Sequence, residues 1–213
     1  LSRWDAVAGG APLLVLEGHT AEVLTIACHG AGDARRIVSG GGDRMVLVWD
    51  AAKRGAPLLK LEGHTGIVYA VACHGEGNAR RIVSGGKDKV VLVWDAVAGG
   101  APLLTLEGHT DGASAVACHR AGDGGRYVSG GEDEVLLVWD AVKGGAPLLK
   151  LEGHTGVVSA VACHRVGDGW RYVSGSRDKT VRVWDVEGGA AARPAVDGHK
   201  ADVRSLACFD DGR

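Results

Sequence analysis

This chain of 213 residues has few phenylalanines, methionines and tyrosines, and it has almost no net charge. It contains one phenylalanine, one methionine and three tyrosines, and its formal net charge is −2. A charge so close to zero provides no electrostatic basis for binding nucleic acid or an anionic membrane. No apolar run approaches the length needed to cross a bilayer. The opening residues, LSRWDAVAGG, lack the basic and then apolar pattern of a signal segment. We therefore expect an intracellular, cytoplasmic protein with neither a nucleic acid nor a membrane as partner.

Three short features recur along the chain at one fixed interval. Trp-Asp occurs at 4–5, 49–50, 94–95, 139–140 and 184–185, and Gly-His at 18–19, 63–64, 108–109, 153–154 and 198–199. Cysteine occurs at 28, 73, 118, 163 and 208. Each series advances by 45 residues without an insertion, and residues 4–48 and 49–93 differ at only 14 of 45 positions. The chain is thus a tandem array of one repeated unit.

Within one unit the apolar residues have the pattern of strands rather than helices. The segments VLTIAC (23–28), RRIVS (35–39), MVLVW (45–49) and PLLKL (57–61) are short apolar runs bounded by Gly, Asp, Asn or Pro. None is long enough for a typical helix, and none has an apolar stripe of helical period. Four strands of about six residues, with four short connections, add up to about 45 residues. A four-stranded sheet repeated identically fits a radial β-propeller.

The Gly-His pair near the start of each unit, with Trp-Asp about 30 residues later, resembles the WD-repeat β-propeller proteins. The resemblance covers essentially the whole chain. It implies an all-β fold, a β-propeller of four-stranded antiparallel blades, with residues 1–213 as a single domain. Four complete blades are expected, beginning near residues 22, 67, 112 and 157.

A fifth blade is expected to be split and partial. Residues 201–208 would form its inner strand, whereas residues 1–4 and 12–16 would form a third and an outer strand. Five periods need 225 residues, 12 more than the chain has, and the missing residues would hold the second strand with its Ser and Asp. The simplest interpretation is a segment of a longer repeat array. A self-closing five-blade ring and self-association through open sheet edges are the alternatives.

Four residue types recur in register, and the resemblance implies that they form a structural hydrogen-bond network. In that network Trp donates to Ser, Ser donates to His, and the other His nitrogen donates to Asp. The sixteen residues are His19, Ser39, Asp43, Trp49, His64, Ser84, Asp88, Trp94, His109, Ser129, Asp133, Trp139, His154, Ser174, Asp178 and Trp184. Ser, His and Asp also make a catalytic triad, but an enzyme needs one nucleophile rather than four equivalents. We therefore predict no catalytic residue and no enzyme activity.

Each unit also contains a Cys-His pair, such as Cys28-His29, that could suggest a metal site. Adjacent residues of a strand point to opposite faces, so one pair is poorly placed to chelate an ion. The spacing matches no zinc-binding framework. Equivalent cysteines of adjacent blades should also be too far apart to form disulfides. We expect free thiols in a reducing compartment, and neither a metal nor a cofactor.

The repeats differ from one another mainly at three positions: three and five residues after each recurring His, and just before the turn Asp. In WD-repeat propellers these positions resemble those on the top face near the central channel, where protein partners dock. The implied partner-binding residues are Glu22, Leu24, Ile67, Tyr69, Lys87, Glu132, Val157, Arg177, Asp202 and Arg204. Ile67 and Tyr69 are the best candidates for apolar anchors. Unconstrained drift after duplication is the alternative explanation of the variability.

The function expected from this pattern is a non-enzymatic scaffold that binds a protein or peptide on the top face. The alternative is a propeller that binds a small ligand or a glycan in equivalent pockets between blades, although the units lack an exposed aromatic platform for a sugar. Trp170 occurs where the other units have Arg or Gly. We expect it to be a local hydrophobic cap rather than a contact on the opposite face.

Overall fold

The computed structural model describes residues 2–3, 14–30, 35–75, 80–119, 125–167, 169–185, 191–192, 196–197 and 200–206. Every regular element in these ranges is a β-strand, which confirms the all-β prediction. Over the same ranges there is no helix with the length and apolarity required to traverse a membrane.

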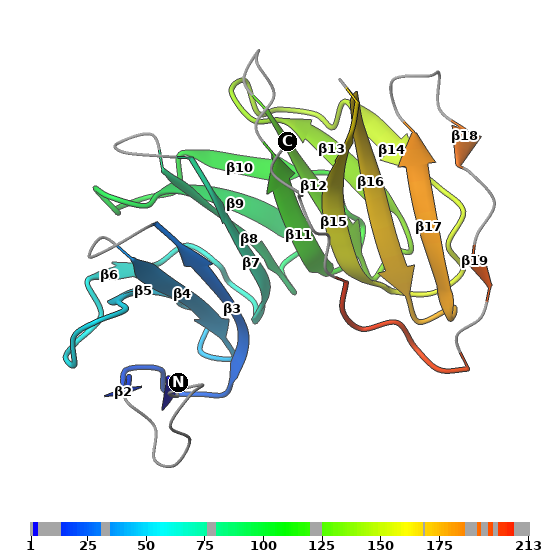
Figure 1. The fold of residues 1–213 in the computed structure, drawn as a ribbon. Helices are drawn as coiled ribbons and strands as arrows, with labels where there is room; N and C mark the ends of the chain where they lie inside the picture. Colours follow the sequence, from blue (N-terminus) through cyan, green and yellow to red (C-terminus); the bar gives the residue numbers. More distant parts are fainter. Residues whose placement is uncertain are drawn as a thin grey trace.

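Four antiparallel sheets follow one another along the chain, and we call them blades one to four (Figure 1). Blade one contains β3 (Val23–His29), β4 (Arg36–Gly41), β5 (Val46–Asp50) and β6 (Leu59–Leu61). Blade two contains β7 (Val68–His74), β8 (Arg81–Gly86), β9 (Val90–Asp95) and β10 (Leu104–Glu107). Blade three contains β11 (Ala113–His119), β12 (Arg126–Gly131), β13 (Leu136–Asp140) and β14 (Leu149–Leu151).

Blade four contains β15 (Val158–Val166), β16 (Gly169–Ser176) and β17 (Thr180–Asp185). Two short strands, β18 (Ala191–Ala192) and β19 (Val196–Asp197), pair with β17 in the place of a single outer strand. This part of the sequence has lost the Ala-Pro-Leu-Leu pattern of the other units. The four blades begin within one residue of the predicted positions, so the predicted repeat boundaries are confirmed.

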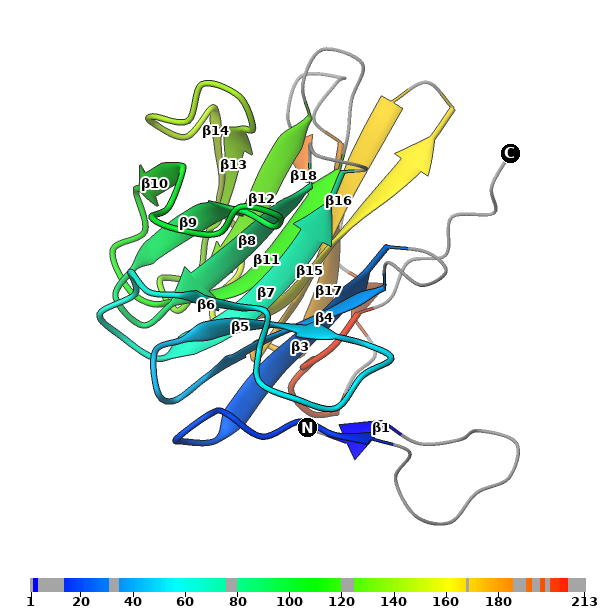
Figure 2. The same ribbon diagram turned by 90° about the vertical axis from the view of Figure 1, so that its left-hand side faces the viewer.

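The blades form an arc with their first strands on the inner side and their last strands at the periphery (Figures 1 and 2). The inner strands pack in succession: β3 against β7, β7 against β11, and β11 against β15. This arrangement brings the same end of each inner strand to one face of the arc, which we call the top face and which contains the turns between second and third strands.

The hydrophobic core lies between blades rather than within one of them. At the first junction Val38, Val46 and Val48 of blade one pack in one cluster with Val68 and Trp94 of blade two. Equivalent positions form the clusters at the second and third junctions. Each fully buried apolar side chain of this kind contributes about 1.5–3 kcal/mol. The junctions therefore provide most of the stability, and each blade depends on its neighbours.

One glycine per blade allows this close approach. A Cβ atom at Gly40 would lie 2.5 Å from Cγ1 of Val68 in the next inner strand, and one at Gly130 would lie 2.4 Å from Cγ1 of Val158. Contacts this short are not compatible with a side chain unless the backbone shifts. The glycine thus sets the spacing between neighbouring blades.

The predicted partial fifth blade is present in part. Strand β1 (Ser2–Arg3) pairs with β2 (Leu14–Val15), and the register Ser2↔Val15 is that of Leu47↔Lys60 in blade one, 45 residues further on. The two strands lie beside blade one (Figures 1 and 2). They correspond to the third and outer strands of a blade that precedes blade one, as predicted.

The prediction of an inner strand at residues 201–208 is wrong for residues 201–206, which are not in a strand. Among the described residues, no strand lies beside them with which they could form a ladder. Val203 is nevertheless buried, and its N–H donates to the carbonyl of Ser176 at 3.1 Å. It occupies the position that Val158 has in the preceding repeat. Residues 207 and 208 lie outside the described residues.

The fold predicts that equivalent core valines differ in their effect on stability. Val128 is fully buried at the third junction, whereas its equivalent Val173 is half-buried at the end of the arc. Val128→Ala should lower the free energy of unfolding by about 2 kcal/mol, and Val173→Ala by less than about 1 kcal/mol. Urea denaturation of dilute protein measures both values. Equal losses would mean that blade four is covered as completely as the internal blades.

Candidate functional site

The structure joins the four recurring residue types of each blade by hydrogen bonds. In blade one, Trp49 Nε1 donates to Ser39 Oγ at 2.8 Å, and Ser39 Oγ lies 2.7 Å from His19 Nε2. The other ring nitrogen, Nδ1, lies 2.8 Å from a carboxylate oxygen of Asp43. The same three contacts, between 2.6 and 3.0 Å, occur in the other blades, in the sets His64, Ser84, Asp88, Trp94; His109, Ser129, Asp133, Trp139; and His154, Ser174, Asp178, Trp184.

The chemistry of the groups gives each network one direction. An indole N–H only donates, so Ser39 Oγ accepts that bond and its own hydrogen is available for His19 Nε2. The imidazole then carries its hydrogen on Nδ1 and donates it to Asp43. Because every donor meets an acceptor, the buried polar groups are satisfied without an unpaired charge inside the blade.

The carboxylate of each network also accepts backbone hydrogen bonds. Thr65 N and Gly66 N donate to Asp88 at 2.7 and 3.3 Å, which ties the start of the repeat to the turn that contains Asp88. Burial opposes ionisation of Asp88, but the bonds from His64 and from these two amides outweigh it and hold the pKa of Asp88 below its ordinary value. In blade four, burial lowers the pKa of His154, even though Asp178 favours the charged form.

The serine hydroxyls are sealed from solvent. Ser39, Ser84, Ser129 and Ser174 are between 0 and 1% exposed. A triad nucleophile must meet its substrate directly, and these hydroxyl groups are already engaged with an indole and an imidazole inside the sheet. The arrangement resembles a triad in composition but offers no access for a substrate.

The variable positions come together on the top face through a backbone bond that recurs in each blade. The amide of the residue before the turn Asp donates to the carbonyl of the third residue after His. The pairs are Gly42–Glu22, Lys87–Ile67, Glu132–Gly112 and Arg177–Val157, with distances between 2.7 and 2.9 Å. Two of the three variable positions are thus direct neighbours in every blade.

The third variable position is the extra residue of a β-bulge. The strand register shifts between Val68 and Ala70, so Tyr69 has no partner in the ladder, and the equivalent shifts leave out Leu24, Ser114 and Ser159. A bulge re-aims the side chain of its extra residue. The amino-acid pattern does not predict these bulges. In the sequence, the bulge position stands out only because its residue varies between repeats.

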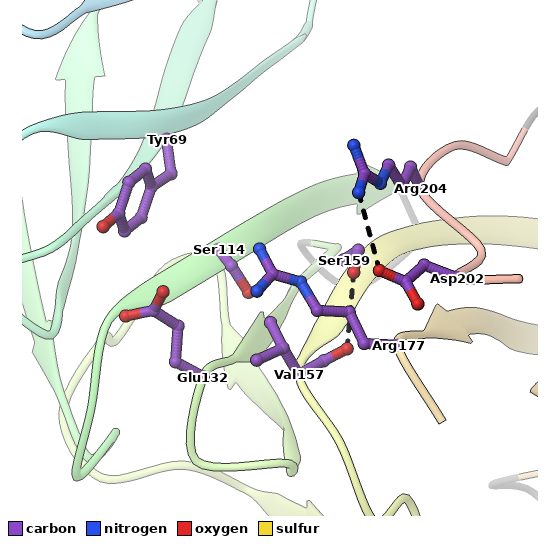
Figure 3. Close-up of a pocket in the computed structure, with 8 residues that line it drawn as sticks. All are labelled: Tyr69, Ser114, Glu132, Val157, Ser159, Arg177, Asp202 and Arg204. Atoms are coloured by element: carbon purple, nitrogen blue, oxygen red, sulfur yellow. Dashed lines mark hydrogen bonds and ion pairs between the residues drawn. The ribbon is translucent and has the colours of Figure 1, made fainter. Parts of the chain in front are cut away.

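One cavity of about 340 Å³ opens among these residues on the top face (Figure 3). It is lined by Tyr69, Ser114, Glu132, Val157, Ser159, Arg177, Asp202 and Arg204. Six of the ten predicted partner-binding residues are in this set. The remaining four, Glu22, Leu24, Ile67 and Lys87, lie outside the cavity lining, with Glu22, Leu24 and Lys87 exposed and Ile67 half-buried.

The cavity has two chemically different sides, with Arg177 between them (Figure 3). Tyr69 and Glu132 lie on one side, where Gly112 makes room for them: a Cβ there would be 3.1 Å from the Tyr69 ring and 2.6 Å from a Glu132 carboxylate oxygen. Burial raises the pKa of Tyr69, and the charge of Glu132 raises it further. On the other side Arg204 pairs with Asp202 at 3.6 Å.

Two histidines of the Cys-His pairs contact the next blade. His74 Nε2 lies 3.1 Å from the hydroxyl of Tyr127, and His119 Nε2 lies 3.2 Å from that of Tyr172. Trp170 stacks on His119 with ring centroids 4.0 Å apart, so it is a cap on the neighbouring blade rather than a local one. In the part of the chain that the structure describes, no group of His, Cys, Asp or Glu is arranged to hold a metal ion, and all four cysteines are free.

Removing the central hydroxyl of one network should destabilise the folded chain. Ser129→Ala leaves the Trp139 indole N–H and the His109 Nε2 atom buried without their shared partner, so we expect the free energy of unfolding to fall by about 2–3 kcal/mol. Ser159→Ala is the matched control, because Ser159 is half-buried on the top face, and its loss should stay within about 0.5 kcal/mol. Urea unfolding followed by tryptophan fluorescence measures both. Equal losses would contradict the importance of the network.

The networks also predict how stability depends on pH. The pKa of His154 lies below its ordinary value of 6.5 in the folded chain, and the pKa of Asp178 lies below 3.8. Both groups therefore bind protons more readily when unfolded, so each contributes stability above its ordinary pKa that is lost as the pH falls. The free energy of unfolding should decrease below about pH 6.5 and decrease further below about pH 4. Denaturation at a series of pH values tests this, and a constant stability between pH 7 and pH 5 would contradict the contribution of His154.

Comparison with known families agrees with this geometry. A family model described as WD domain, G-beta repeat matches residues 10–50, 55–95, 100–140 and 145–185. Each match begins before the outer strand of the preceding blade and ends with the third strand of the next blade. A comparison with curated proteins gives no match. Because the four matches together cover most of the chain, this protein belongs to the WD40 repeat family.

Proposed function

We propose that this chain is a non-enzymatic scaffold whose top face binds a protein or peptide. WD40 repeats generally mediate protein–protein interactions as scaffolds, and this proposal extends that role to one surface of this chain. The observation that carries it is the separation of constant and variable residues. The recurring polar residues are buried in the blades, whereas six of the residues that differ between repeats line one cavity.

The cavity supports a ligand with both apolar and charged groups. Its volume of about 340 Å³ is at the lower end of the range for ligand pockets. Such a space admits one or two side chains of a docked segment rather than a large ligand. Tyr69 supplies an aromatic surface beside the Glu132 carboxylate, and Arg177 supplies a planar donor for a carboxylate or carbonyl group.

The four-residue networks support the proposal through their burial. We infer that they stabilise the blades and take no part in catalysis, since the serine hydroxyls are covered and each is already hydrogen-bonded. We further propose that residues 1–213 act as one domain, and that the free thiols of the described cysteines reflect a reducing compartment such as the cytoplasm.

The rival function, a small-ligand or glycan site repeated between blades, has less support. A cavity of about 380 Å³ does lie between blades one and two, lined by Arg36, Val48, Leu58, Leu59, Arg80, Ala96 and Val97. Its lining contains no aromatic side chain for a sugar platform. The Arg80 position is Gly125 in the next repeat and Trp170 in the one after. The junctions therefore differ in chemistry where a repeated pocket would need the same residue.

Peptides selected for binding from a random display library test the proposed face. Tyr69→Ala should weaken the selected peptides by about 1–2 kcal/mol, or about 5–30-fold in Kd, because it removes the aromatic surface of the cavity. Leu148→Ala is the control, since Leu148 is similarly apolar but exposed away from the cavity. Isothermal titration calorimetry measures each Kd. Peptides that bind Tyr69→Ala and Arg177→Ala as tightly as the parent chain would contradict the proposal.

A further inference from the structure

The cavity of about 380 Å³ between blades one and two lies at the end of the blades opposite to the top face. Strand β4 begins at Arg36 and runs toward its top-face turn, and Arg80 directly precedes the equivalent strand β8. Both arginines line the cavity, and its other lining residues are all apolar: Val48, Leu58, Leu59, Ala96 and Val97. The lining therefore has two positive charges and no negative one.

Arg80 has no counter-charge among the described residues. Its Nε atom is buried without a hydrogen-bond partner, and no ion pair joins its guanidinium to a carboxylate in this part of the chain. The neighbouring Arg81, by contrast, pairs with Asp95 at 3.3 Å. Arg36 has only a distant partner, since its Nη1 atom lies 3.8 Å from Asp50. Because a partly buried charge without a partner is unfavourable, an anion in the cavity would stabilise this arrangement.

The two arginine charges also act on one imidazole at the same junction. Burial lowers the pKa of His29, and the charges of Arg80 and Arg36 lower it further. The Nε2 atom of His29 is buried without a hydrogen-bond partner, because blade two has Ile82 where blade three has Tyr127, whose hydroxyl contacts the equivalent histidine. The positive potential of this junction is thus relieved by no acidic or hydroxyl group of the described residues.

The other two internal junctions do not repeat this arrangement. The position of Arg80 is Gly125 at the second junction and Trp170 at the third. Trp170 covers the imidazole of His119 by stacking, with ring centroids 4.0 Å apart. We therefore expect one site of this kind in the described blades rather than a pocket repeated between them.

We propose that this cavity binds a small organic anion in which a carboxylate is attached to a short apolar chain. The carboxylate accepts hydrogen bonds from Arg80 and Arg36, because a planar guanidinium can hold both carboxylate oxygens. The chain lies against Leu58 and Val97, which are 50% and 52% exposed, and removes their apolar surface from water. The volume of the cavity is within the range for small-ligand pockets. The site is separate from the top face and does not depend on peptide binding there.

Octanoate is the probe for this site, and its binding at pH 7 is followed by the amide chemical shifts of the 213-residue chain. It should bind with a Kd on the order of 1 mM and shift the amides of Ala96 and Val97. Acetate lacks the chain and octanol lacks the charge, so each should bind at least about 10-fold more weakly. Octanoate that does not bind at about 10 mM, or acetate or octanol that binds as tightly as octanoate, overturns the proposal.

A charge variant tests the role of Arg80. Arg80→Gln should weaken octanoate binding at least about 10-fold, because it removes a charge-assisted hydrogen bond. Arg44→Gln is the matched control, since it removes the same charge from an exposed turn at the other end of blade one. It should bind octanoate like the parent chain. Equal affinities of the Arg80→Gln variant and the parent chain would exclude the site.

An apolar variant tests the wall of the cavity independently of the charge. Leu58→Ala should weaken octanoate binding about 3-fold or more, because it removes apolar surface that the chain covers. Leu103→Ala is the control: Leu103 is the equivalent residue at the second junction and is similarly exposed, at 49%. This variant should bind like the parent chain. If Leu103→Ala weakens binding as much as Leu58→Ala, octanoate binds elsewhere and the proposal fails.

Discussion

One buried serine hydroxyl in each blade is the group on which the rest of the structure depends. It accepts the indole N–H of the third strand and contacts the imidazole that precedes the first strand, and the imidazole contacts the carboxylate of the turn. The hydroxyl therefore connects three segments that are also held by the ladder, by backbone hydrogen bonds at the turn and by apolar packing. With these segments fixed, the turn Asp and the residues beside it take the same place in every blade. The position of the residues on the top face therefore depends on the hydrogen bonds of the buried serine hydroxyl.

Much of the fold follows from the constant spacing of the repeat. Because every signal recurs after 45 residues, four weak strand patterns reinforce one another, and the start of each blade could be located to within one residue. The four network residues could be selected for the same reason. The bulges at Leu24, Tyr69, Ser114 and Ser159 could not be predicted, since an extra residue in a ladder leaves no signature in composition. Residues 201–206 have the sequence pattern of a strand, but no strand in the described part of the chain pairs with them, and a local pattern cannot predict this.

Contacts across blade boundaries were also beyond sequence reasoning. Trp170 stacks on His119, which belongs to a different repeat, and nothing in the sequence around either residue predicts this contact. The cavity on the top face shows the same dependence, since its lining comes from four successive repeats. The differences between repeats identify which positions vary, whereas the geometry decides which of those positions lie together. Tyr69 and Glu132 meet because Gly112 occupies the place between them.

The uniform length of the unit has an evolutionary consequence. Because the complete blades share the apolar core positions of their two faces, a duplicated or deleted unit leaves every remaining junction with a closely similar neighbour. Unequal exchange between tandem copies of the coding sequence would then change the size of the array in whole blades and keep the core contacts at the new joint. Each exchange would also bring different variable residues together on the top face. Such an array obtains new recognition surfaces by rearranging existing units, before any single residue has to change.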